Sequence, residues 1–296
     1  MVAARKSDLA MIETSAPRAG VAGWPVDHSR SPTIHRYWLK ELGIAGSYEK
    51  FAVRPGEFRR FASKIGEDGL VGANVTAPHK EAAFSACDQR TPVAETLGAV
   101  NTLWRQDGRL WGDNTDVAGF LANLDEASPG SAERGKVAVV IGAGGAARGI
   151  VYALVSRGFK RVVVVNRTRA RAEALAAHFG DSTTTAPWAD LATELPEADL
   201  LVNASSLGMV GQSPLAIDLS GLPQRAVVAD AVYVPLRTPL IEAARARRLR
   251  VAEGLGMLLH QAAPSFARWF GQRPVVTPAL HALVEAEVMA TTGAAQ

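Results

Sequence analysis

Residues 136–171 limit the possible folds more than any other part of this sequence. Residues 137–141 form a short apolar run, which is typical of a parallel strand buried on both faces. A glycine-rich turn follows, then apolar residues at helical spacing, and then a second β-branched run at residues 162–165. A β-α-β unit of about thirty residues with such a turn is the signature of a Rossmann-type dinucleotide-binding domain.

The turn itself matches G-x-G-x-x-A. Gly142 can adopt backbone angles that a side chain forbids, Gly144 allows a pyrophosphate to approach the main chain, and the small Ala147 permits close helix packing. Free N–H groups at the start of the helix would hold the phosphates. The candidate cofactor-binding residues in the turn are Gly142, Ala143, Gly144, Gly145, Ala146 and Ala147.

The end of the second strand indicates which dinucleotide is bound. NAD-binding proteins usually place Asp or Glu there to hold the ribose 2′-hydroxyl, but this sequence has Asn166, Arg167 and Thr168, with Arg171 four residues after Arg167. Two guanidinium groups could form charge-assisted hydrogen bonds to a 2′-phosphate. The sequence therefore favours NADP(H), although surface arginines are often only solvated.

Composition excludes several classes of protein. The 296 residues are 48% hydrophobic and 21% charged, as in a globular protein, and no apolar run approaches the roughly 20 residues that span a bilayer. The net charge of +3 gives no reason to expect nucleic acid as a partner. Cys87 is the single cysteine, which excludes an internal disulfide and a thiolate-rich metal site and fits a reducing cytoplasm. We expect a monomer or homodimer that binds a small molecule and no metal.

Strand and helix patterns also alternate before the glycine-rich unit, so we predict a two-domain α/β fold with the active site in the cleft between the domains. Residues 1–20 lack periodicity and are interpreted as a loose extension, with the first strand at residues 21–26. Residues 21–115 and 255–296 are assigned to the substrate-binding domain, and residues 116–254 to the nucleotide-binding domain. A loop is expected at residues 125–135, a helix from Thr238 to Arg250, and a break at Gly254 to Gly256 before the next helix.

Small polar residues gather beyond several predicted strand ends. Ser29 and Ser31 precede Pro32, so Ser31 is a candidate N-cap of the helix that follows. Lys80 lies in residues 76–81, which are interpreted as a loop because Pro78 breaks regular structure. Asn-Thr and Asp-Asn pairs around residues 101 and 114 also form ordinary turns, so each cluster alone is weak evidence of a site.

Several motifs in a fixed order make the chain resemble the shikimate dehydrogenase family. In the first half they are HSRSP at residues 28–32, NVTAPHK at 74–80, GAVNTL at 98–103 and GDNTD at 112–116. In the second half they are GAGGAAR at 142–148, NRTRAR at 166–171, NASSLGM at 203–209, DAVYVPLRTPL at 230–240 and GLGMLLHQA at 254–262.

The resemblance implies an oxidoreductase that reversibly reduces 3-dehydroshikimate to shikimate with NADPH, a step of the shikimate pathway of aromatic amino-acid biosynthesis. It implies that Lys80 and Asp116 are the catalytic pair. It further implies cofactor contacts for Ser205, Gly254 and Met257, with Ser205 replacing a frequent threonine. The implied substrate-binding residues are Ser29, Ser31, Asn74, Thr76, Asn101, Tyr233 and Gln261.

Two other functions remain open at this point. A quinate/shikimate dehydrogenase would use NAD, against which Arg167 and Arg171 argue. A dinucleotide-binding regulator without turnover would have no need of a proton donor such as Lys80.

Overall fold

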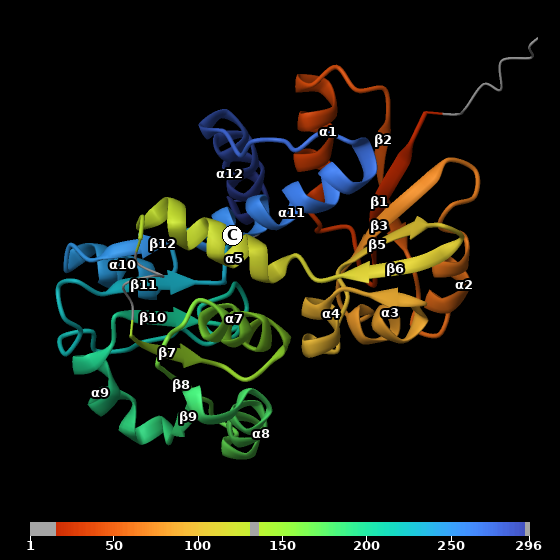
Figure 1. Ribbon diagram of the computed structural model, residues 1–296. Helices are drawn as coiled ribbons and strands as arrows, with labels where there is room; N and C mark the ends of the chain where they lie inside the picture. Colours follow the sequence, from red (N-terminus) through yellow and green to blue (C-terminus); the bar gives the residue numbers. More distant parts are fainter. Residues whose placement is uncertain (1–15, 131–135, 294–296) are drawn as a thin grey trace, which may run out of the picture.

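The computed structural model describes residues 16–130 and 136–293, which form two sheets joined by two helices (Figure 1). Each sheet has six strands, and helices alternate with strands along the chain. The predicted α/β class is therefore confirmed. None of the helices in these residues is long and apolar enough to cross a membrane.

The first sheet is mixed and has the order β2-β1-β3-β5-β6-β4. Strands β1, β2 and β3 are parallel, β5 is antiparallel to both β3 and β6, and β4 is parallel to β6. Its strands are β1 (Arg18–Gly23), β2 (Ser47–Ala52), β3 (Leu70–Val75), β4 (Gln89–Arg90), β5 (Thr102–Gln106) and β6 (Arg109–Asp113). The helices between them are α1 (Ser31–Glu41), α2 (Phe58–Ser63), α3 (Lys80–Ala86) and α4 (Pro92–Leu97).

The second sheet is entirely parallel and has the order β12-β11-β10-β7-β8-β9. This is the doubly wound order in which a ligand binds where the winding of the chain reverses, here beside β7. Its strands are β7 (Val137–Ile141), β8 (Arg161–Val165), β9 (Thr183–Ala186), β10 (Leu200–Asn203), β11 (Val227–Asp230) and β12 (Arg250–Ala252). Its helices are α7 (Gly145–Ser156), α8 (Arg169–Phe179), α9 (Leu191–Glu194) and α10 (Pro239–Ala246). The 3₁₀ turn η1 (Gly180–Ser182) precedes β9, and the 3₁₀ turns η2 (Trp188–Asp190) and η3 (Leu195–Glu197) lie between β9 and β10.

Helices α5 (Asp116–Ala127) and α11 (Gly254–Phe270) run between the two sheets (Figure 1). They cross closely because Gly119 has no side chain: a Cβ there would lie 2.5 Å from the Cβ of Gln261 and 2.8 Å from its backbone. Phe120 and Leu124 of α5 pack in the core of the second sheet with α7. Helix α11 and the last helix, α12 (Pro278–Gly293), instead complete the core of the first sheet.

Three predicted boundaries in the first half are wrong. The first strand runs from Arg18 to Gly23 and not over residues 21–26. It begins early because polar Arg18 pairs its backbone with β2 and its guanidinium with Glu49, which an apolar pattern does not reveal. It ends early because Pro25 has no N–H to pair. Residues 18–20 are thus not part of a loose extension, while residues 1–15 lie outside the described residues. Ser31 is the first residue of α1 and makes no capping bond with its side chain, since Arg30 occupies the N-cap position. Lys80 lies in the first turn of α3 and not in a loop, because strong helix formers follow it directly.

In the second half, the helix that Thr238 caps ends at Ala246 and not at Arg250. Arg248 has a left-handed backbone conformation with φ 57°, which turns the chain into β12 without any glycine to signal it. Gly254 does not separate two helices but begins α11. Helix α5 continues to Ala127, so only part of the loop expected at residues 125–135 is present, and residues 131–135 lie outside the described residues.

Candidate active site

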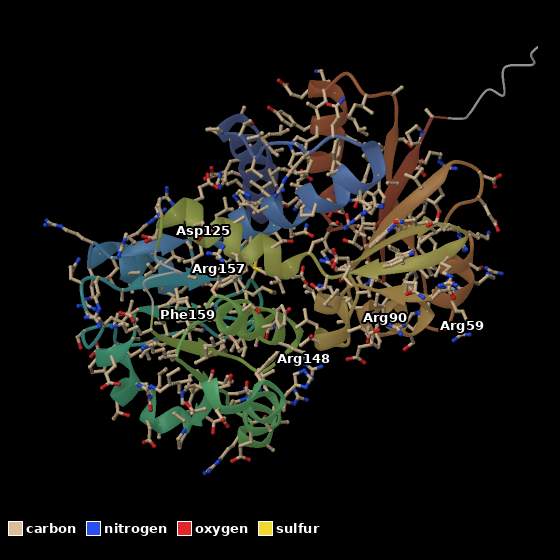
Figure 2. All side chains as sticks on the ribbon, in the orientation of Figure 1. Arg59, Arg90, Asp125, Arg148, Arg157 and Phe159 are labelled. Atoms are coloured by element: carbon tan, nitrogen blue, oxygen red, sulfur yellow. The ribbon has the colours of Figure 1, made fainter. Side chains whose placement is uncertain are left out.

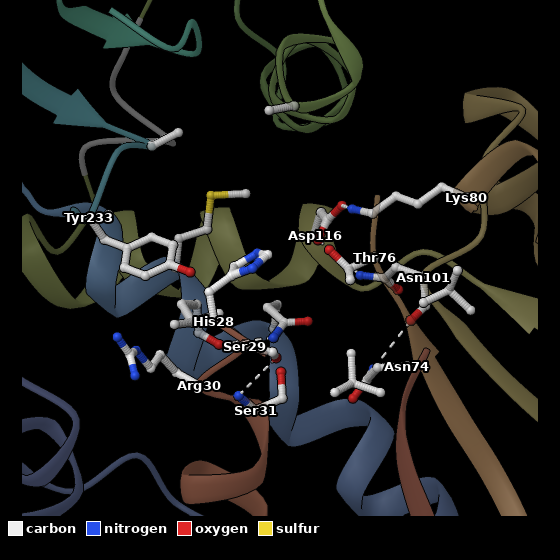
Figure 3. Close-up of a pocket in the computed structure, with 18 residues that line it drawn as sticks. His28, Ser29, Arg30, Ser31, Asn74, Thr76, Lys80, Asn101, Asp116 and Tyr233 are labelled. Atoms are coloured by element: carbon white, nitrogen blue, oxygen red, sulfur yellow. Dashed lines mark hydrogen bonds and ion pairs between the residues drawn. The ribbon is translucent and has the colours of Figure 1, made fainter. Parts of the chain in front are cut away.

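A polar cavity of about 270 Å³ lies where β1 and β3 end, facing the start of α7 (Figure 3). Strand ends and helix starts bring its walls together from both halves of the chain. All nine residues expected to bind substrate or catalyse the reaction line this cavity: Ser29, Ser31, Asn74, Thr76, Lys80, Asn101, Asp116, Tyr233 and Gln261. Other residues that were expected elsewhere or not at all also line it, among them His28, Arg30, Ala146, Gly254 and Met257.

Lys80 and Asp116 form an ion pair across the cavity, with 2.5 Å between Nζ and Oδ2 (Figure 3). Each stands in the first turn of a helix, Lys80 in α3 and Asp116 in α5. The second carboxylate oxygen of Asp116 accepts a hydrogen bond of 2.9 Å from Nδ2 of Asn101. The carboxylate is therefore fixed on both sides, and it holds the ammonium of Lys80 at the edge of the cavity, where the Lys80 side chain is 36% exposed.

The opposite end of the cavity is formed by the turn before α1 and by Tyr233. The backbone N–H of Ser31 donates to Oγ of Ser29 over 3.4 Å, so Ser29 takes the local structural role expected of Ser31. Burial raises the pKa of Tyr233, and the positive charge of Arg30 opposes that rise. Arg30 is itself held by α12, with 2.8 Å to Oε1 of Glu287 and 2.6 Å to Oγ1 of Thr291.

Two further cavities continue from this one along the carboxyl edge of the second sheet. One of about 740 Å³ shares Thr76, Lys80, Asp116 and Ala146 with the first, and it also has Ala143, Gly144, Gly145 and Arg171 in its walls. The other, of about 650 Å³, contains Gly142, Asn166, Arg167, Thr168 and Ser205. Because neighbouring cavities share residues, they form one continuous surface from the glycine-rich turn to the Lys80–Asp116 pair.

The residues of the glycine-rich turn can accommodate the phosphate groups of a dinucleotide. Gly142 has φ 117°, and a Cβ there would lie 2.9 Å from the backbone of Ala204, so the turn requires glycine at that position. Nothing lies within 4 Å of a Cβ placed on Gly144 or Gly145, which leaves the N-terminus of α7 open to a ligand. Ala147, like Gly142 and Gly254, is buried, and it packs in the core beneath α7, as its packing role requires.

Arg167 and Arg171 are exposed beside this surface. Arg167 precedes α8 and Arg171 lies in its first turn. Arg169 pairs with Glu173 at 2.7 Å, whereas no ion pair to a described residue is found for Arg167 or Arg171. Both guanidinium groups thus remain available to an anionic ligand.

Buried polar groups fix the loops on the nucleotide side. The carboxylate of Asp230, at the end of β11, accepts hydrogen bonds from Asn203, Thr238 and the backbone of Val232. Burial raises the pKa of the Asp230 carboxyl, although these three hydrogen bonds oppose the rise. Asn203 in turn accepts from the hydroxyl of Ser205 at 2.7 Å. These bonds hold the loop after β10 and the loop after β11 in one arrangement.

Several residues that line the cavities were not predicted from the sequence, among them His28, Arg30, Arg148 and Trp188. His28 and Arg30 lie inside the HSRSP motif and Arg148 ends the GAGGAAR motif, so membership of a motif is the signal that could have found them. Arg148 extends from α7 to donate to the carbonyl of Leu97 over 3.1 Å (Figure 2). Trp188 follows β9, a strand that the sequence pattern did not predict, and so nothing placed it near Arg167.

The geometry defines a class of protein: a two-sheet α/β protein with a dinucleotide-type glycine turn that opens onto a polar cavity containing a Lys–Asp pair. Family models match in three segments. They are described as shikimate dehydrogenase substrate binding domain over residues 21–103, shikimate/quinate 5-dehydrogenase over residues 127–210, and shikimate 5′-dehydrogenase C-terminal domain over residues 254–283.

Individual proteins agree with these models. The chain is 60% identical over 277 residues to a shikimate dehydrogenase (NADP(+)) of Methylocella silvestris, covering 94% of this chain and 99% of the relative. The chain therefore belongs to the shikimate dehydrogenase family, as its motifs predicted.

Solved structures give the same fold. One is shikimate 5-dehydrogenase of Thermus thermophilus in complex with NADP(H) and shikimate, with a TM-score of 0.80 at 38% identity, covering 92% of this chain and 99% of that one. Another is quinate dehydrogenase of Corynebacterium glutamicum in complex with NAD, with a TM-score of 0.84 at 30% identity and the same coverage.

Proposed function

We propose that the protein is an NADP-dependent shikimate dehydrogenase that reversibly reduces 3-dehydroshikimate to shikimate, in the cytoplasm, within the shikimate pathway. The observation that carries the proposal is the position of the Lys80–Asp116 pair. Both residues line the polar cavity and also the adjoining cavity bounded by the glycine-rich turn. A substrate bound in one cavity and a cofactor bound in the other would therefore meet beside Lys80, which can donate a proton.

NADPH held by the glycine-rich turn and by Arg167 and Arg171 would supply a hydride for the carbonyl carbon, and residues of this chain would stabilise the charge that then develops on the ketone oxygen. Negative charge develops on the ketone oxygen, where the ammonium of Lys80 stabilises it and donates a proton. Asp116 orients that ammonium through the 2.5 Å ion pair. In the reverse direction Lys80 accepts the proton of the hydroxyl.

We propose roles for the other predicted residues that agree with this geometry. Ser29, Ser31 and Tyr233 would bind the substrate carboxylate at the end of the cavity near α1, while Asn74, Thr76, Asn101 and Gln261 would bind its hydroxyls. Arg167 and Arg171 would bind the 2′-phosphate of NADP(H). In this proposal residues 21–115 and 255–296 form the substrate-binding domain, and residues 116–254 the nucleotide-binding domain.

The test is an absorbance assay of reduced nicotinamide with shikimate and quinate, each combined with NADP and NAD. Turnover should be fastest with shikimate and NADP. Because the solved quinate dehydrogenase with NAD is also similar in structure, the quinate and NAD combination is the informative rival. Preference for that combination would contradict the proposal, and no turnover with any of the four would favour a binding protein.

The roles of Lys80 and Asp116 have a separate test. We expect Lys80→Ala to lower kcat by roughly 10²- to 10⁴-fold, the usual range for general acid–base catalysis, with a much smaller change in the KM for shikimate. Asp116→Asn should also lower kcat, and the double variant should lose much less than the product of the two single losses. Lys160→Ala, an exposed lysine of the second sheet, is the control. Near-normal kcat in folded Lys80→Ala would show that another group moves the proton.

A further inference from the structure

Tyr48 lies behind the wall of the substrate cavity and is fully buried. Its ring stacks on His35, with 3.9 Å between ring centroids and 6° between ring planes. Its hydroxyl donates to Oδ1 of Asn74 over 2.6 Å. Burial raises the pKa of Tyr48 well above its ordinary value, so the hydroxyl keeps its proton and acts as a permanent donor. Asn74 therefore meets a fixed hydrogen-bond donor on the side away from the cavity.

The amide nitrogen of Asn74 is fully used inside the protein. Nδ2 has two N–H groups, and three acceptors lie 3.2 Å from it: the carbonyl of Asn101, Oγ1 of Thr102 and Oγ of Ser265. Oδ1 keeps one acceptor position beyond the bond from Tyr48. Asn74 is 5% exposed, and that exposure is in the cavity. It can offer a bound molecule only an acceptor.

Asn101 offers the cavity the opposite kind of hydrogen-bonding group. Its Oδ1 accepts from the backbone N–H of Thr115 at 2.9 Å, from Oγ1 of Thr115 at 3.1 Å and from Oγ1 of Thr102 at 3.0 Å. Its Nδ2 donates one N–H to Asp116 and retains a second. Asn101 therefore offers the cavity only a donor.

We infer that one directed chain of hydrogen bonds, from Tyr48 through Asn74, Thr102 and Asn101 to Asp116, sets the polarity of the substrate-binding wall. Tyr48 is a positioning residue in this chain, because it fixes which end of the Asn74 amide faces the cavity. The inference rests on the proposed function and adds to it a rule for how the substrate is oriented.

The rule follows from what each oxygen of the substrate can do. A ketone oxygen accepts hydrogen bonds but cannot donate them, so it would repel the carbonyl oxygen of Asn74 and fits beside Asn101 and Lys80. A hydroxyl can donate to Asn74. The polarity of the wall thus selects which ring oxygen stands near Lys80 and is reduced, and which one remains a hydroxyl.

Tyr48→Phe tests the chain directly, since it removes the hydroxyl and keeps the ring. Asn74 then loses the donor that fixes its Oδ1, and we expect the KM for shikimate to rise by about 5- to 30-fold, while kcat changes by less than about threefold. The increase should disappear with one of two deoxyshikimates, each lacking one hydroxyl that is not oxidised. Tyr37→Phe is the matched control, because the Tyr37 hydroxyl lies 3.3 Å from Oγ1 of Thr277, away from the cavity.

A second measurement needs no variant and so does not depend on the folding of Tyr48→Phe. Two shikimate analogues carry fluorine in place of one or the other unoxidised hydroxyl, and fluorine cannot donate. The analogue with fluorine facing Asn74 should bind the wild-type protein about tenfold more weakly than the other. Equal binding of the two would overturn the inference, as would an equal loss by Tyr48→Phe with shikimate and both deoxyshikimates. In either case normal turnover of shikimate would leave the proposed function intact.

Discussion

His35 is a titratable residue without a charge partner. It is fully buried among Trp38, Tyr48, Phe266 and Trp269, and neither ring nitrogen has a hydrogen-bond partner in the described residues. Burial lowers its pKa from 6.5 to about 3. The folded protein therefore keeps His35 neutral at pH values where the unfolded chain takes up a proton.

This difference predicts a loss of stability in acid. Between pH 6.5 and pH 3 the unfolded state binds one more proton at His35 than the folded state, so the free energy of unfolding falls as the pH falls. The loss approaches about 1.4 kcal/mol per pH unit within that window and is absent above it. His35→Phe keeps an aromatic ring and should flatten this dependence. Urea unfolding of both proteins at several pH values is the measurement, and parallel curves would contradict the prediction.

Ser31 was the expected N-cap and no structural role was expected of Ser29, but of the two it is Ser29 that accepts a local hydrogen bond. Ser31 makes no capping bond, so Ser31→Ala should change the free energy of unfolding by less than about 0.5 kcal/mol while it raises the KM for shikimate. Ser29→Ala removes the acceptor of the Ser31 backbone N–H and should lower stability by about 0.5 to 1 kcal/mol. Thermal unfolding and KM, measured on both variants, separate the two effects. A large stability loss for Ser31→Ala alone would restore the original assignment.

At the scale of elements, the strand–turn–helix of β7 and α7 contains glycines with different tasks. Gly142→Ala should destabilise the fold, because φ 117° disfavours a side chain and the added Cβ would lie 2.9 Å from Ala204. Gly144→Ala adds a methyl to open space and should leave the melting temperature almost unchanged. It should nevertheless weaken NADP binding, since the methyl would occupy the approach of the pyrophosphate. Calorimetry of unfolding and of NADP binding tests both, and equal NADP affinity in Gly144→Ala would refute this use of the turn.

The sequence predicts elements best where one period continues over many residues. The parallel strands β7 and β8 are apolar runs, and both lie within a residue of their predicted positions. Pattern reasoning failed where a few residues take their conformation from neighbours distant in sequence. Strand β12 has three residues, follows a left-handed arginine, and exists because it pairs with β11. Arg18 begins β1 for a similar reason.

The residues expected to bind the substrate lie in recognisable motifs, and all of them line one cavity. Tyr48, which lies behind the wall of that cavity, was not predicted. It has no feature in the sequence that sets it apart from ordinary core residues, and its importance comes from the hydrogen bond that it donates to Asn74. Such bonds depend on distances between segments, which spacing along the chain does not supply.

At the scale of the whole molecule, two hydrogen bonds join α4 of the first sheet to helices of the second. Arg148 of α7 donates to the carbonyl of Leu97, and Nε2 of His178 in α8 lies 2.8 Å from the carbonyl of Thr96. Both bonds join the two halves, and the first lies beside the cavity that the glycine-rich turn bounds, because Arg148 and Leu97 line that cavity. They connect the two halves of the protein at a place where relative movement would open the cavity.

Loss of both bonds should therefore loosen the arrangement. We expect the double variant Arg148→Ala and His178→Ala to have a larger radius of gyration than the wild type by small-angle X-ray scattering without ligands. Arg161→Ala is the control, because Arg161 pairs with Glu194 and Glu197 inside the second half. An unchanged radius of gyration would show that α5 and α11 alone hold the two halves in place.

The path of the chain through the two sheets also sets the order in which the molecule can be completed during synthesis. Strand β1 and helix α1 leave the ribosome early, yet Leu259, Phe266 and Val284, which cover them, belong to the last two helices. The second sheet draws its core from residues between these two parts of the chain. The half that is proposed to bind the substrate is thus synthesised first in part and completed last. The nucleotide-binding half can form its core before α11 and α12, which complete the core of the first sheet, have been synthesised.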